Sequence, residues 1–111
     1  MNIVIREKSD FMPDTFIRIY EDRIEFEENN KNRVLKYNSE QIKEIMRMFL
    51  TLSKRWDSKY IGKGIIDDDV FVITVEGNKN KEYYIKNKYP QNWSDFVLFR
   101  NKLVREEIKF N

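Results

Sequence analysis

The chain contains no cysteine, no histidine and no alanine, and it has only three glycines and two prolines among 111 residues. Without cysteine it has no disulfides, thiolate metal sites or cysteine nucleophiles. Without histidine it has neither the Ser-His-Asp type of catalysis nor an ordinary zinc site. We therefore expect no metal, no cofactor and no enzyme activity.

The absence of alanine points to the genome rather than to the fold. Ile, Lys, Asn, Phe and Tyr, which have AT-rich codons, supply 51 of the 111 residues. Alanine is the best helix former, so a helical protein would not avoid it for structural reasons. We infer a low-GC bacterium or its phage as the source. The N-terminus lacks the pattern of a signal peptide and no apolar run reaches membrane-spanning length, so we expect a cytoplasmic protein with no membrane contact.

Length and aromatic content predict one domain over residues 1–111, because eight Phe, six Tyr and two Trp can build a core without staples. Alternating or β-branched runs predict strands at 3–7, 16–20, 24–27, 33–37, 70–75 and 82–86. Loops are expected at 9–14 and 60–69. The predicted fold class is α+β, a mainly antiparallel sheet of about five or six strands with two helices on one face, in the order β-β-β-β-α-β-β-α.

The two helices are predicted from apolar spacing of 3.6 residues. The first is capped by Asn38 or Ser39 and runs to about Asp57, with Trp56 at the end of its apolar stripe. The second begins near Trp93 or Ser94, and its apolar face extends to Ile108. The predicted core comprises Ile17, Ile19, Ile24, Phe26, Ile45, Met46, Phe49, Phe71, Ile73, Phe96 and Leu103.

Charge is unevenly distributed along the chain, which carries a net charge of +2. Acid is concentrated in a segment that we call the acidic hairpin: Glu21, Asp22, Glu25, Glu27 and Glu28. Acidic strands can dock on basic partner surfaces, because electrostatics steers association. The alternatives are a solvent face that protects the sheet from aggregation, or charges that are neutralised locally after folding.

Basic and aromatic residues alternate in the segment 79–93. The candidates for contacts with nucleic acid are Lys79, Lys81, Tyr83, Tyr84, Lys86 and Lys88, since lysines bind phosphates and rings stack on bases. Alternation would place one of the two tyrosines in the core. A solvated hairpin is the competing interpretation.

Two short motifs contain residue types that occur in ligand sites. Asp67, Asp68 and Asp69 could attract a cation, but their spacing does not match a calcium loop, so a solvated turn is the better interpretation. Gly62-Lys63-Gly64 lacks the pattern of a phosphate loop. No spacing pairs a nucleophile with a base.

Residues 52–104 carry Trp56, Tyr60, the acidic turn at 67–69, Tyr84 and a Tyr89-Pro90 pair that precedes Trp93 and Phe96. This pattern resembles that of a group of small proteins from low-GC Gram-positive bacteria. The resemblance implies a shared fold unit and carries no assigned activity.

The sequence therefore predicts a non-catalytic protein-binding module, of the kind represented by inhibitors, immunity proteins and anti-defence proteins. Its partner would be another protein, contacted through the acidic hairpin. The alternative is a nucleic-acid-binding module that uses the hairpin 79–93. The sequence leaves the oligomeric state open.

Overall fold

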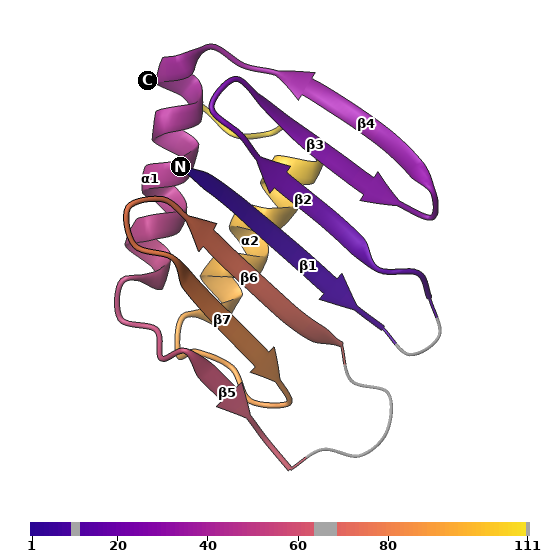
Figure 1. The fold of residues 1–111 in the computed structure, drawn as a ribbon, viewed down its shortest axis with the longest axis vertical. Coiled ribbons are helices and arrows are strands. Elements are labelled where there is room, and N and C mark those ends of the chain that lie inside the picture. The colour runs from indigo at the N-terminus through magenta and orange to yellow at the C-terminus, as the bar shows by residue number, and fades with distance from the viewer. Residues whose placement is uncertain (10–11, 64–68, 111) are drawn as a thin grey trace.

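A computed structural model describes residues 1–9, 12–63 and 69–110. These residues form a seven-stranded sheet with the strand order β4-β3-β2-β1-β6-β7-β5 (Figure 1). The strands are β1 (Asn2–Lys8), β2 (Thr15–Ile19), β3 (Arg23–Glu28), β4 (Lys31–Lys36), β5 (Lys59–Ile61), β6 (Val70–Glu76) and β7 (Lys81–Lys86). All neighbouring pairs are antiparallel except β5 and β7, which are parallel.

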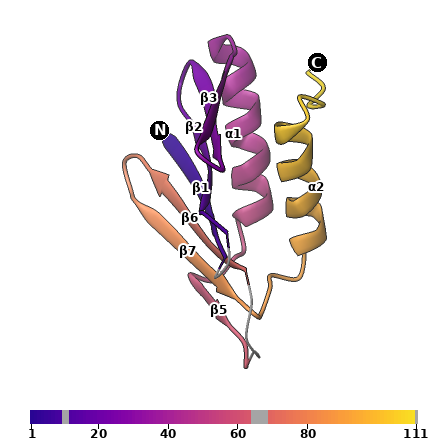
Figure 2. The same ribbon diagram turned by 90° about the vertical axis from the view of Figure 1, so that its right-hand side faces the viewer.

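Two helices, α1 (Ser39–Ser53) and α2 (Trp93–Val104), lie side by side on one face of the sheet (Figure 2). The α+β class, the helices on one face and the predicted order of the strands and helices are confirmed, but the strand count is seven rather than five or six. The additional strand is β5, and two of its three residues, Tyr60 and Ile61, fall in the segment predicted to be a loop. Three residues contain too little alternation to be recognised, and the pairing partner Tyr84 is distant in sequence.

The core lies between the sheet and the helices. Every residue of the predicted core is buried, and Ile3, Ile5, Ile42, Val75, Tyr83, Ile85 and Phe99 are buried with them. Because side chains alternate along each strand, the residues between the buried ones point to the sheet face opposite the helices. We call it the open face; it includes Val4, Arg6, Phe16, Arg18, Glu25, Glu27, Val72, Tyr84 and Lys86.

Helix α1 begins as expected and ends earlier than expected. Asn38 forms a capping box: its side chain accepts from the Gln41 backbone at 2.8 Å, and the Gln41 side chain accepts from the Asn38 backbone at 3.1 Å. The helix ends at Ser53 rather than near Asp57. At this end the Asn92 side chain donates to the Leu52 carbonyl at 2.8 Å, in place of the backbone N–H that would continue the helix.

Trp56 therefore lies beyond the helix, half-buried against the core. Its ring packs edge-on against Phe49, Tyr83 and Phe96, with ring centroids 5.5 to 6.0 Å apart. Helix α2 similarly ends at Val104, short of Ile108, and Glu106 adopts a left-handed conformation with φ 57° just after it. Among the described residues no helix is long and apolar enough to cross a membrane.

Candidate functional site

The acidic hairpin does not form one compact patch. Glu21 and Asp22 lie in the turn between β2 and β3, Glu25 and Glu27 lie on the open face of β3, and Glu28 lies at the opposite end of that strand. At about 3.3 Å per residue, the two ends are roughly 20 Å apart. A single small basic site on a partner could not contact all five carboxylates.

Four of the five carboxylates are paired inside the chain. Glu21 lies 3.3 Å from the N-terminal ammonium group. Arg23 donates to Asp22 at 2.8 Å and to Glu25 at 2.7 Å, and Arg18 lies 3.4 Å from Glu27. Glu28 has no ion pair within the described residues. This arrangement favours local neutralisation, while contact of the hairpin with a partner stays a prediction.

The basic and aromatic residues of 79–93 are divided between the two faces of β7. Tyr83 is buried, with 6% of its surface exposed, so its ring cannot stack on a base. Lys81 lies on the same side of the strand, whereas Tyr84 and Lys86 lie on the open face beside Lys59 and Ile61 of β5. Lys79 lies in the turn at the other end of β7, and Lys88 follows the strand. The structure thus brings together only part of the predicted set.

The centre of the open face holds an aromatic ring between two arginines. The Arg18 and Arg6 guanidinium carbons lie 4.2 and 5.4 Å from the centre of the Phe16 ring. Arg6 in turn donates twice to Asp14, at 2.8 and 2.5 Å. These contacts balance most of the charge of the two arginines, as expected for a sheet face exposed to water.

The two short motifs lie partly outside the described residues. Asp67, Asp68 and Gly64 fall in the segment 64–68, and Asp69 is exposed. Among the residues described, no group of three acidic side chains gathers to hold a metal ion. Gly62 has a structural role, because a Cβ atom at this position would collide with the carbonyl oxygen of Asn87.

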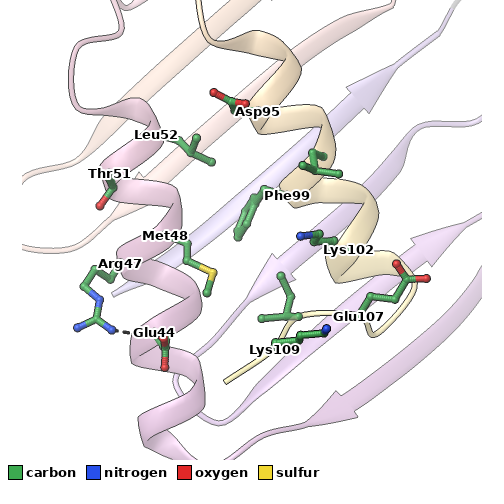
Figure 3. Close-up of a pocket in the computed structure, with 12 residues that line it drawn as sticks. Glu44, Arg47, Met48, Thr51, Leu52, Asp95, Phe99, Lys102, Glu107 and Lys109 are labelled. Atoms are coloured by element: carbon green, nitrogen blue, oxygen red, sulfur yellow. Dashed lines mark ion pairs between the residues drawn. The ribbon is translucent and has the colours of Figure 1, made fainter. Parts of the chain in front are cut away.

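The two helices and the C-terminal segment border a groove of about 850 Å³ that we call the helix groove (Figure 3). Its lining residues come from α1, α2 and the C-terminal segment: Glu44, Arg47, Met48, Thr51, Leu52, Asp95, Leu98, Phe99, Lys102, Glu107, Ile108 and Lys109. Met48 and Leu52 point from α1 toward α2, and Phe99 points back toward α1, whereas Arg47 and Thr51 point away (Figure 3). The floor of the groove is therefore apolar.

The rim carries an exposed leucine. Leu98 exposes 55% of its surface although it lies in the middle of α2, between the half-buried Val97 and the buried Phe99. Leu98 extends the apolar floor of the groove onto the surface, which enlarges the apolar area that a partner could contact. The sequence signal for this position is the run of four apolar residues at 96–99, which is wider than the buried stripe of a helix needs.

The groove is charged at its two ends. Asp95 lies at one end, and Lys102, Glu107 and Lys109 lie at the other, where two ammonium groups outnumber one carboxylate (Figure 3). Neither lysine forms an ion pair with another described residue. On the α1 side, Arg47 lies 3.6 Å from Glu44 and is thereby balanced.

One carboxyl group on the helix side of the sheet has an altered titration. Burial raises the pKa of Glu7 above its ordinary value of 4.5, and the Arg100 guanidinium, which donates to this carboxylate at 2.9 Å, opposes part of that increase. The pair ties β1 to α2. It lies apart from the helix groove, among whose lining residues neither member is found.

No family model, curated protein sequence or solved structure matches this chain.

Proposed function

We propose that this protein is a non-catalytic protein-binding module that acts in the cytoplasm of a low-GC bacterium or its phage, as inhibitors, immunity proteins and anti-defence proteins do. The observation that carries the proposal is the helix groove, an apolar depression of about 850 Å³ bordered by the exposed Leu98. A surface of this kind is favourable for binding apolar side chains of a partner. The chain also lacks cysteine and histidine, the residue types on which much catalysis depends.

The groove supports the proposal better than the acidic hairpin does. Carboxylates that are already paired with Arg18 and Arg23 gain less from a basic partner, because the partner must compete with an existing ion pair. The apolar floor of the groove has no covering group among the described residues other than its own lining. We therefore place the main contact at the groove and leave the hairpin as a steering surface.

The test is a quantitative capture from the lysate of a low-GC Gram-positive bacterium and from a phage-infected culture. The baits are the unchanged protein, Leu98→Glu, and a variant with the five hairpin acids changed to Gln or Asn. Because Leu98 is exposed, its replacement should preserve the fold, which circular dichroism would check. We expect one or a few proteins to be enriched by the unchanged bait and lost with Leu98→Glu.

Two outcomes would argue against the proposal. Enrichment that survives Leu98→Glu but disappears with the hairpin variant would move the contact to the hairpin. If none of the baits enriched any protein above the background of an unrelated tagged protein, the protein-binding function itself would be contradicted.

A second candidate, nucleic-acid binding, is favoured by one observation. Tyr84 and Lys86 share the open face with Lys59, so a ring and two ammonium groups lie next to each other on an uncovered sheet. Single strands bind to such combinations of stacking and charge. A mobility-shift assay with single-stranded DNA and RNA at low salt tests it. A shift abolished by the double variant Tyr84→Ala, Lys86→Glu would support this candidate, and no shift at low salt would eliminate it.

A further inference from the structure

The apolar floor of the helix groove has the dimensions of a short helix contact. Met48 and Leu52 are one helical turn apart on α1, and Leu98 and Phe99 lie opposite them on α2. Along α2 the groove extends from Asp95 to Lys102, a separation of seven residues or about 10 Å. Apolar anchors at positions i, i+4 and i+7 of a bound helix span the same length.

The charges at the two ends of the groove favour one orientation of a bound helix. Asp95 would attract a cation at one end, and the other end would attract a carboxylate, because Lys102 and Lys109 outweigh the single charge of Glu107 there. A helix has a positive N-terminal end and a negative C-terminal end. The favoured orientation therefore places the N-terminus of a bound helix near Asp95 and its C-terminus near Lys102.

We propose that the helix groove binds an amphipathic helix of the partner protein, and this inference rests on the protein-binding function proposed above. The helix carries apolar residues at i, i+4 and i+7, a Lys or Arg near its N-terminal end and a Glu or Asp about two turns later. It lies parallel to α2, with its apolar residues between Met48, Leu52 and Phe99. Leu98 covers the side of the bound helix.

A second copy of this chain fits the groove less well. Two copies that met at this surface would place one depression against another, which leaves the apolar floor unfilled. The described residues that are exposed and apolar on the two helices, Leu50 and Leu98, are isolated side chains and do not form a protruding ridge. A convex partner is required, and an amphipathic helix provides one.

The test is a titration of the ¹⁵N-labelled protein with a synthetic 18-residue helical peptide. The peptide carries leucines at i, i+4 and i+7 on an Ala-rich background. One Lys precedes the first leucine, and one Glu follows seven residues after that Lys. We expect the amide signals of Met48, Leu52, Leu98 and Lys102 to shift at millimolar peptide or below. A peptide of the same composition in scrambled order is the control and should leave them unchanged.

Variants of the protein test which side chains form the contact with the peptide. Leu98→Glu should weaken binding at least tenfold, and Lys102→Glu roughly two- to fivefold with a dependence on salt, as for an exposed ion pair. Lys79→Glu, in the turn between β6 and β7, is the matched control and should have no effect. A spin label at the peptide N-terminus should broaden the signals of Asp95 and Leu52 rather than those of Lys109.

Several results would overturn the inference. These are no shift at millimolar peptide, equal binding of the scrambled peptide, or binding unaffected by Leu98→Glu. Concentration-dependent self-association that is lost in Leu98→Glu would identify a second copy as the occupant instead. If the peptide fails while a protein from the lysate still depends on Leu98, the protein-binding function stands and only the helical occupant is wrong.

Discussion

Asn92 is the residue that holds the end of α1, the indole of Trp56 and the start of α2 together. Its carboxamide oxygen accepts from the Trp56 indole N–H at 2.7 Å, and its amide nitrogen donates to the Leu52 carbonyl at 2.8 Å. Both partners are polar groups at the margin of the core. A side chain with one donor and one acceptor on the same carbon satisfies both at once.

We predict that Asn92→Ala lowers the free energy of unfolding by roughly 1–3 kcal/mol, because it leaves the indole N–H and the carbonyl unpaired. Urea denaturation followed by tryptophan fluorescence would measure the change. Asn78→Ala, at an exposed turn position, is the matched control and should change stability by no more than about 0.5 kcal/mol. Equal stability of the two variants would contradict this role of Asn92.

Glu7 makes a pH-dependent contribution to the free energy of unfolding. Because its pKa is higher in the folded chain than its ordinary value of 4.5, the folded state binds more protons than the unfolded state as the pH rises above 4.5. The free energy of unfolding therefore falls with rising pH until the raised pKa has been passed. In Glu7→Gln this fall is absent.

The stability of Glu7→Gln relative to the unchanged protein should thus increase as the pH rises from about 4 through the raised pKa, by at most about 1.4 kcal/mol for each unit of the pKa increase. Urea denaturation at several pH values measures the difference. A difference that stays flat would show that Arg100 offsets burial, and one that moves toward the unchanged protein with rising pH would show that Arg100 outweighs burial; either result contradicts the prediction.

At the scale of elements, β5 depends on a glycine. The Gly62 backbone N–H donates to the Lys86 carbonyl at 2.8 Å, and a Cβ atom at Gly62 would overlap the carbonyl oxygen of Asn87. The backbone here cannot yield easily, because Asn87 is itself in a left-handed conformation with φ 61°. β5 can pair with β7 only if the next residue has no side chain.

We expect Gly62→Ala to push β5 away from β7 and to cost roughly 1–3 kcal/mol, the range for overpacking. Hydrogen exchange should quicken at the Tyr84 amide, which donates to the Ser58 carbonyl at 2.9 Å. Gly77→Ala is the control, because a Cβ atom there would meet the Met1 side chain at an ordinary 3.8 Å. Similar exchange rates in both variants would be the opposing result.

The elements differ in how well the sequence predicts them. Strands such as β2 and β3 are predictable because alternation of Ile17 and Ile19, then Ile24 and Phe26, is a local signal with one buried face. β5 is not, because its pairing is parallel and non-local. The apolar pattern places the ends of α1 and α2 several residues beyond the observed ones, because it continues to Trp56 and Ile108. A hydrogen bond from Asn92 ends α1, and the left-handed Glu106 follows the end of α2.

The candidate site was less predictable than the fold. Periodicity identifies which residues of α1 and α2 face the core, but a groove depends on how far apart two helices lie, and no local pattern encodes that distance. Leu98 could have been noticed as an apolar residue outside the buried stripe. The acidic hairpin was visible in the sequence, but the arginines that neutralise it are interleaved with it, so its pairing became clear only from the register of β2 and β3.

At the scale of the whole molecule, the sheet and the helices give the protein two different surfaces. The open face mixes apolar and charged side chains, and its central arginines are paired internally, with Arg6, Arg18 and Asp14 around Phe16. The helix side carries the helix groove, whose floor is apolar, and this groove lies on the outer side of two helices that are already fixed by the core. A rigid surface of this kind binds with little loss of conformational freedom.

The dissociation constant of the captured partner, measured by titration calorimetry for the unchanged protein and for Leu98→Glu, tests the central claim most directly. We expect binding at least tenfold weaker for Leu98→Glu, with the five-residue hairpin variant changed much less. Equal affinity of Leu98→Glu and the unchanged protein, with both fully folded, would contradict the assignment of the helix groove as the binding surface.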